Sequence, residues 1–183
     1  MREHRSETHA ATPWHVAVAL EDVSEAGGHF DLVADADTRA AVARLARLRD
    51  LPRLQANFEV RRHGAGGLRV TGRVFATVGQ ACVITLEPLV NEIEEDVDLI
   101  FLPSAIAVTN GESIEPRREH GDEVEPLIDG RVDLGALAVE FLVLGLDPYP
   151  RKPGAVFQPP NDATADEGPF AALAALKKER NGP

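Results

Sequence analysis

The chain has 183 residues, of which 44% are hydrophobic and only 5% aromatic, and its formal net charge is −11 at pH 7. This size and apolar content predict one domain with tails, whose core is mostly aliphatic. The single cysteine, Cys82, excludes an intramolecular disulfide and a multi-cysteine zinc site. Because the start of the chain lacks the apolar region of a signal peptide and no apolar run could span a bilayer, we expect a cytoplasmic protein with no membrane partner.

The positive charge is concentrated in one part of the chain. Residues 39–73 hold nine arginines and only two acids, a local charge of +7, and the rest of the chain therefore carries −18. The total argues against a strongly basic nucleic-acid-binding protein. Arginine is nevertheless suited to bidentate phosphate recognition, so this segment is the first candidate for contact with RNA.

The N-terminal part predicts two short strands behind a tail. Residues 1–13 are polar and without pattern, which is typical of a disordered tail. We expect strands at residues 14–20 and 30–33, the second pairing back on the first after a turn at Gly27 and Gly28.

An amphipathic helix is predicted next. Asp37 or Thr38 can cap its start, it should run to about Arg49, and Leu51 and Pro52 end it. Three arginines are expected on the arc opposite its apolar stripe: Arg39, Arg44 and Arg47.

The centre of the chain predicts the sheet of an α+β fold, an antiparallel β-meander packed against two or three helices. Apolar and polar residues alternate with a period of two from residue 54 to residue 102. A hairpin loop at residues 63–67 and a tight turn at Gly79 and Gln80 separate the strands. We expect Cys82 to lie inward on the following strand as a buried structural thiol.

Acidic residues cover one face of the next predicted strand. Glu92, Glu94, Asp96 and Asp98 alternate with apolar residues. A divalent-metal nuclease site is one interpretation. A solvated strand face that pairs with Arg69 and Arg73 of the neighbouring strand is the simpler one, and it would leave those two arginines less available to RNA.

A second helix is predicted after an acidic loop at residues 103–127. Asp133 is well placed as its N-cap, and residues 134–146 contain one charged residue, Glu140. A helix this apolar is either buried on several sides or covered by a partner. Glu140 is expected on its one solvated arc or in an ion pair with Arg131 or Arg151; an unpaired carboxylate with a raised pKa is the alternative.

Four sequence blocks carry a resemblance. They read CVITLEPL from residue 82, DGRVDLGALAVE from residue 129, LDPYPRKPGAVF from residue 146 and PFAALAALKK from residue 169. As a set they resemble the YceD family of bacterial and plastid proteins, known as large ribosomal RNA subunit accumulation proteins, and most of all its alphaproteobacterial branch. The motif positions are Cys82, Leu86, Glu87, Pro88, Asp129, Gly130, Asp133, Leu134, Glu140, Pro148, Tyr149, Pro150 and Arg151.

The resemblance also implies a domain organisation. We expect the disordered tail at residues 1–13, one YceD-like α+β domain at residues 14–157 that includes the acidic loop, and a linker with a short C-terminal helix at residues 158–183.

Catalytic, metal and cofactor sites are not expected. Many members of the family carry a Cys-x-x-Cys pair where this chain has Cys82 and Thr85, and one thiolate without converging ligands does not hold a structural zinc. The six histidines fall in tails, turns or a first strand and show no ligand spacing. We therefore predict a protein that is not an enzyme and has no cofactor.

Two parts of the chain are candidates for RNA contact: the basic segment and residues 149–152. The second combines an aromatic ring, a stiff backbone and two cations, which can stack a base and contact a phosphate. The alternative is a wrap at the end of the helix, with Tyr149 packed on the sheet. The predicted RNA-binding residues are Arg39, Arg44, Arg47, Arg61, Arg62, Tyr149, Arg151 and Lys152.

The family resemblance implies a non-catalytic ribosome biogenesis factor that supports synthesis, processing or stability of the large-subunit (23S) ribosomal RNA. Its expected partner is that RNA or a precursor ribosomal particle, contacted directly or through a protein. An acidic protein-binding adaptor without RNA contact is the alternative, and a hydrolytic nuclease is the least favoured class. The sequence does not predict an oligomeric state.

Overall fold

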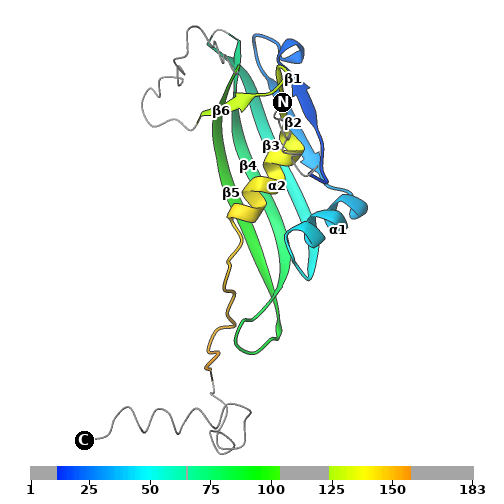
Figure 1. The fold of residues 1–183 in the computed structure, drawn as a ribbon, viewed down its shortest axis with the longest axis vertical. Helices are drawn as coiled ribbons and strands as arrows, with labels where there is room; N and C mark the ends of the chain where they lie inside the picture. The colour runs from blue at the N-terminus through cyan, green and yellow to red at the C-terminus, as the bar shows by residue number, and fades with distance from the viewer. Residues whose placement is uncertain (1–11, 65, 104–123, 158–183) are drawn as a thin grey trace, which may run out of the picture. The chain divides into compact units, whose positions relative to one another are not determined.

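The computed structural model describes residues 12–64, 66–103 and 124–157. The chain divides into two units at Lys152, and everything below concerns the first. A curved five-stranded sheet in the order β2-β3-β4-β5-β6, a separate two-stranded sheet, two α-helices and a short 3-10 helix form this unit (Figure 1). The strands are β1 (Ala17–Ala19), β2 (Gly28–Val33), β3 (Asp50–His63), β4 (Gly67–Ala81), β5 (Pro88–Pro103), β6 (Val124–Leu127) and β7 (Arg131–Asp133). The helices are the short 3-10 helix η1 (Leu20–Asp22), α1 (Ala36–Leu45) and α2 (Leu134–Leu144).

The predicted antiparallel meander is confirmed. Strands β3, β4 and β5 pair as neighbours along nearly their whole length, and the pairing of the first two extends to His63 and Gly67. One addition makes the sheet mixed, because β6 pairs in parallel with the end of β5. The predicted loop at residues 103–127 is therefore wrong at its end, while residues 104–123 lie outside the described part of the chain.

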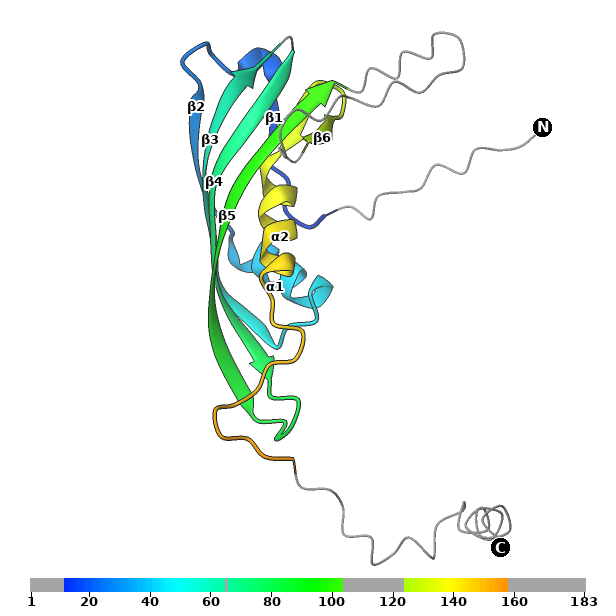
Figure 2. The ribbon, with the colours of Figure 1, turned by 90° about the vertical axis from the view of Figure 1, so that its left-hand side faces the viewer.

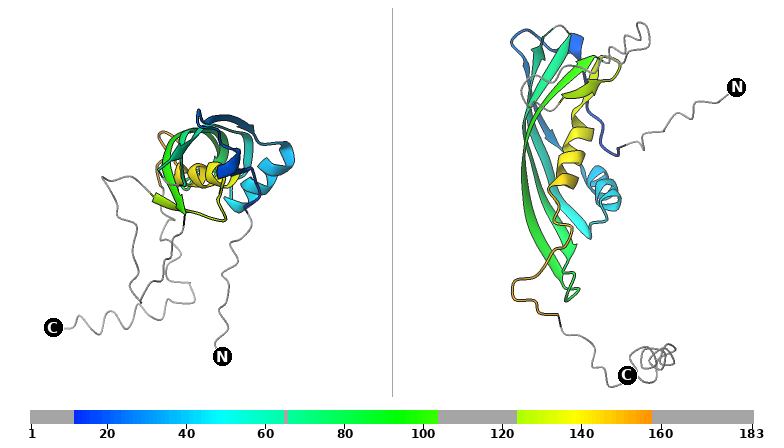
Figure 3. Two further views of the ribbon diagram at one scale, coloured as in Figure 1. Left: turned by 90° about the horizontal axis from the view of Figure 1, so that it is seen from above. Right: turned by 60° about the vertical axis from the view of Figure 1, so that its left-hand side comes forward.

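Both helices lie on the same side of the sheet (Figure 2), and the long strands curve around α2 (Figure 3). The inward residues of the strands meet α2 there in an aliphatic core. Its largest fully buried side chains include Leu54, Phe58, Leu68, Leu134 and Leu142. In the described part of the chain no helix covers the other side of the sheet, so buried apolar residues alternate along the strands with exposed and mostly polar ones, as the period of two predicts.

Helix α1 begins and ends earlier than predicted. Asp35, not Asp37 or Thr38, is the N-cap, and its carboxylate accepts the Thr38 N–H at 2.8 Å. The helix ends at Leu45, because Arg47 adopts a left-handed conformation with φ of 55°. Arg47 therefore lies outside the helical arc on which the sequence placed it.

Hydrogen bonds define the end of α1 as a Schellman motif. The Leu48 N–H donates to the Ala43 carbonyl at 2.9 Å, and the Arg47 N–H donates to the Arg44 carbonyl at 3.3 Å. Leu51 and Pro52, predicted to end the helix, belong to β3 instead.

One predicted pairing and one predicted turn were also wrong. Strand β1 pairs with β7 and β2 pairs with β3, so the first two strands do not form a hairpin. Strand β4 continues through Gly79 and Gln80 to Ala81, and the connection to β5 is formed by residues 82–87. Pro88 opens β5, at a position where a proline costs no ladder hydrogen bond.

Helix α2 begins as predicted and ends two residues early. The Asp133 carboxylate accepts the N–H groups of Gly135 and Ala136, each at 3.0 Å, and Gly145 is the C-cap. None of the helices in the described part of the chain is long and apolar enough to cross a membrane. The predicted N-terminal tail, except for residues 12 and 13, and the predicted C-terminal linker and helix lie outside the described residues.

Candidate nucleic-acid interface

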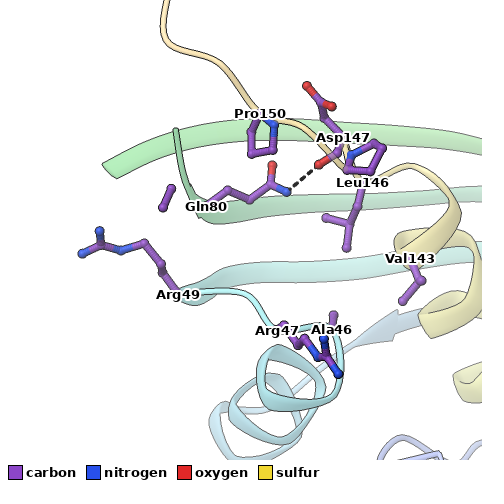
Figure 4. A pocket seen from close by; sticks show the side chains of 10 residues that line it. Ala46, Arg47, Arg49, Gln80, Val143, Leu146, Asp147 and Pro150 are labelled. Carbon is purple, nitrogen blue, oxygen red and sulfur yellow. Dashed lines mark hydrogen bonds between the residues drawn. The ribbon is translucent and has the colours of Figure 1, made fainter. Parts of the chain in front are cut away.

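The structure brings together two of the parts predicted to contact RNA. The end of α1 and the segment that follows α2, here called the proline segment (residues 147–152), face each other across a groove of about 460 Å³. In Figure 4, Ala46 and Arg47 come from one side of this groove, Asp147 and Pro150 come from the other, and Gln80 of β4 lies between them. The sequence could predict both walls, but not that they are neighbours.

Hydrogen bonds hold the proline segment on the sheet. The Gln80 side-chain N–H donates to the Asp147 carbonyl at 2.9 Å, and the Asn91 side-chain N–H donates to Gln80 Oε1 at 2.9 Å. The Val83 N–H donates to the Pro150 carbonyl at 2.9 Å. This wall of the groove is therefore fixed to β4, to β5 and to their connection.

A second hollow of about 420 Å³ adjoins the groove along α1, and Arg49 lines both. Arg39 and Arg44 also line it, and the acid beside them is Asp50. We refer to Arg44, Arg47 and Arg49 as the arginine surface. None of these three side chains makes an ion pair or a hydrogen bond with another side chain of the described residues. Arg49 was not among the predicted binding residues; its position in the +7 segment was the signal that could have included it.

Two predicted RNA-binding arginines have structural partners instead. Arg39 donates to the Ala34 carbonyl at 2.6 Å, and Arg62 donates to the Val23 carbonyl at 2.7 Å. Arg61 lies next to Arg62 in the sequence, near the end of β3. The proline segment lies toward the other end of the sheet (Figure 1). The predicted arginines of the basic segment thus fall into three groups: Arg44 and Arg47 of the arginine surface, Arg39 bonded to the backbone before α1, and Arg61 and Arg62 near the β3–β4 hairpin.

The proline segment presents its predicted residues unequally. Tyr149 is 69% exposed, so the alternative in which it packs on the sheet does not hold. The Lys152 ammonium pairs with Glu87 at 2.9 Å, and that hydrogen bond lowers the pKa of the Glu87 carboxyl. Arg151 is exposed.

Carboxylates of β5 hold the arginines on the open side of the sheet. Arg69 pairs with Asp98 at 2.7 Å, and Arg73 pairs with Glu94 and with Asp96, each at 2.8 Å. The predicted pairing of the acidic strand with Arg69 and Arg73 is therefore confirmed. Arg53 pairs in the same way with Glu92 at 2.6 Å. We refer to Arg53, Arg69 and Arg73 as the sheet arginines. Within the described ranges, no group of acids, histidines and cysteine is arranged to hold a metal ion.

Cys82 is fully buried, as predicted, but for a different reason. It belongs to the β4–β5 connection, not to a strand, and its Sγ accepts the N–H groups of Lys152 at 3.3 Å and Thr85 at 3.4 Å. These N–H groups, that of Lys152 first, lower the pKa of the thiol to about 6. Through the hydrogen bond from Lys152, Cys82 links the β4–β5 connection to the proline segment.

Other motif positions build the turns around these elements. Leu86 is 76% exposed and has φ of 60°, because the connection reverses direction there. Asp129 and Gly130 both have positive φ in the turn between β6 and β7. Glu140 is exposed on α2, in agreement with the expected solvated arc.

Comparison with known families gives one match. The family model described as Large ribosomal RNA subunit accumulation protein YceD matches residues 70–177, which is more than half of the chain. Searches of curated proteins and of solved structures find no match. The matched residues include the proline segment and exclude α1, so one wall of the groove lies within the family match and the arginine surface lies outside it.

Proposed function

This protein is a member of the YceD family of large ribosomal RNA subunit accumulation proteins, and from that premise we propose that it is a non-catalytic ribosome biogenesis factor. In this proposal it acts in the cytoplasm and supports the synthesis, processing or stability of 23S ribosomal RNA. It does so by binding that RNA, or a precursor particle, through the arginine surface and the proline segment.

The observation that carries the proposal is that, among the described residues, the side chains of Arg44, Arg47 and Arg49 have no ion-pair partner. Three guanidinium groups without a carboxylate partner form a local positive surface on a chain whose net charge is −11. RNA would be repelled from most of the remaining surface, so charge alone favours one orientation of the complex. Exposed Tyr149 adds a ring on which a base can stack.

The same residues support a binding role over a catalytic one. The carboxylate that lines the groove belongs to Asp147, and its Oδ1 accepts the Tyr149 N–H at 2.8 Å. Gln80 uses both ends of its amide within the fold. Apart from this carboxylate, the lining offers cations and apolar surface to a ligand, and these groups bind a polyanion without transferring a proton.

An acidic protein-binding adaptor is the second candidate, because the helices also expose apolar side chains. Leu45 is 54% exposed and Leu144 is 70% exposed. Such side chains are typical of a contact with another protein.

Crosslinking in living cells separates the two candidates. Ultraviolet crosslinking followed by sequencing of bound RNA should recover 23S ribosomal RNA or its precursor, and replacing Arg44, Arg47 and Arg49 by glutamine should remove that signal. Recovery of a crosslinked protein without RNA, unchanged by these substitutions, would favour the adaptor.

A further inference from the structure

We propose that the groove between the end of α1 and the proline segment binds one unpaired nucleotide of single-stranded RNA. The phosphate would contact Arg47 and Arg49, and the base would lie on the apolar wall. This inference rests on the proposed function and adds to it a recognition of the base.

The first argument is the conformation of Arg47. Its φ of 55° is unfavourable for arginine, and the corresponding position of a Schellman motif is commonly glycine. Within the described chain, the Arg47 side chain makes no ion pair that would offset the strain. Strained residues of this kind gather at binding sites. A ligand outside the chain therefore explains why arginine, and not glycine, stands here.

The second argument is the composition of the groove. Arg47 and Arg49 supply charge, while Leu146, Pro148 and Pro150 supply apolar surface on the opposite wall (Figure 4). A nucleotide has the same division, since it joins an anionic phosphate to a flat and largely apolar base face. The volume of about 460 Å³ is in the range of small-molecule sites.

The third argument is what the groove lacks for a peptide. A bound peptide would bury backbone N–H and C=O groups, and each one needs a hydrogen-bond partner. Gln80, the amide at the floor, already donates to Asp147 and accepts from Asn91. A base can bind by stacking alone, whereas an acidic peptide would leave its backbone unpaired in this groove.

The strand must be single, because a base enters such a groove only when it is splayed out of a helix. Tyr149 follows Pro148 directly and is 69% exposed, so the neighbouring base can stack on its ring.

The test compares RNA with and without bases. Fluorescence anisotropy with the full chain measures binding of a short uridine oligomer, of an abasic ribose-phosphate oligomer of the same length, and of polyglutamate. We expect the uridine oligomer to bind at least about fivefold more tightly than the abasic one. Arg47→Gly should weaken binding of both oligomers, because a phosphate contact is lost, while the melting temperature stays equal or rises, because glycine relieves the strain.

Two further variants keep the test decisive. Arg47→Asn tolerates the left-handed conformation and serves if the glycine variant does not fold. Arg131→Gln removes an exposed arginine from β7, remote from the groove lining, and should change neither preference nor affinity.

Each other outcome overturns a different claim. Equal binding of both oligomers overturns the nucleotide groove and leaves the backbone contact of the proposed function. Binding of neither oligomer overturns both. Binding of polyglutamate more tightly than either oligomer overturns the ligand class and favours an acidic peptide.

Discussion

The sheet arginines and the arginine surface belong to the same 35-residue basic segment, yet they have opposite surroundings. Arg53, Arg69 and Arg73 each pair with a carboxylate of β5. Arg44, Arg47 and Arg49 have no such partner among the described residues, and they lie beside a groove. Local charge alone therefore does not identify a binding surface; the cross-strand neighbour of each arginine decides whether it is available.

Strand register explains the difference. Arg73 lies opposite Asp96 and diagonal to Glu94, and Arg69 lies diagonal to Asp98, within reach of long side chains. Arg53 and Glu92 both neighbour Thr77, one from each side, and meet across it. Among the strands that the structure describes, no acidic strand faces the end of α1. The comparison predicts that the same substitution, arginine to glutamate, costs stability on the sheet and costs binding at α1.

The largest expected effect is on binding. Replacing Arg44, Arg47 and Arg49 together by glutamate should weaken binding of large-subunit ribosomal RNA at least about 100-fold, because three phosphate contacts are lost. The slope of log affinity against log salt should fall by about 2. Filter binding across a salt series measures both quantities. Arg62 is left unchanged here because it donates to the Val23 carbonyl.

The fold is the control for that experiment. A urea midpoint equal to that of the parent would show that the three side chains are not needed for folding. If the variant binds precursor particles as well as the parent does, the arginine surface is only a solvated face, and the distinction between the two sets has no functional meaning.

The next effect is on stability. Arg73→Glu removes two exposed ion pairs and places a third carboxylate beside Glu94 and Asp96. Exposed pairs contribute little individually, so we expect the free energy of unfolding to fall by about 1–2 kcal/mol, with RNA affinity unchanged. Urea denaturation measures the loss. Adding Glu94→Arg to this variant should restore part of the lost free energy of unfolding. If no stability is recovered, the loss of the cross-strand ion pairs is not what destabilises the Arg73→Glu variant.

A loss of stability that depends on pH is expected for Cys82→Ser. The Cβ–O bond of serine is shorter than the Cβ–S bond of cysteine. The hydrogen bonds from the N–H groups of Lys152 and Thr85 would therefore become longer and weaker. The lowered thiol pKa gives a signature: the stability difference should be fully present above the pKa of an unfolded cysteine, about 8.5, and shrink as the pH falls through about 6. Thermal melts across this range measure it.

A measurement of ribosomal RNA accumulation distinguishes a structural role of the Cys82 thiol from a reactive one. Because Cys82 only fixes the proline segment, ribosomal RNA accumulation should persist in the serine variant at a permissive temperature. Loss of accumulation with an unchanged melting curve would give the thiol a direct role.

The sequence predicted the elements whose signals are local. Alternation of period two predicted β3, β4 and β5, and Asp133 predicted the start of α2. The pairing of the acidic strand with Arg69 and Arg73 also followed, because adjacent strands in a meander are neighbours.

Non-local features could not be predicted in this way. The strain at Arg47 ends α1 early, and no propensity places an arginine in the left-handed region. The groove depends on the proline segment returning to β4, a contact between residues 67 positions apart in the chain. The Cys82 Sγ accepts the N–H of Lys152, 70 positions away. Strand alternation therefore predicted the burial of Cys82 correctly, although Cys82 does not lie in a strand.

The smallest effect concerns single carboxyl groups, and it distinguishes the two sets of arginines most directly. The hydrogen bond from Arg69 lowers the pKa of Asp98 below its ordinary value. A group with a lowered folded pKa stabilises the fold above its unfolded pKa, about 3.9 for aspartate, and that contribution is lost as the pH falls through the folded pKa. Arg69→Gln should therefore raise the pKa of Asp98, which carboxyl-detected NMR titration measures. The stability difference from the parent should narrow as the solution is acidified below pH about 3.9. Arg44→Gln is the matched control, since Arg44 pairs with no carboxylate in the described chain, and its stability difference should not change over the same range. Equal acid sensitivity in the two variants would mean that both sets of arginines have carboxylate partners in solution, and the arginine surface would then not be free for RNA.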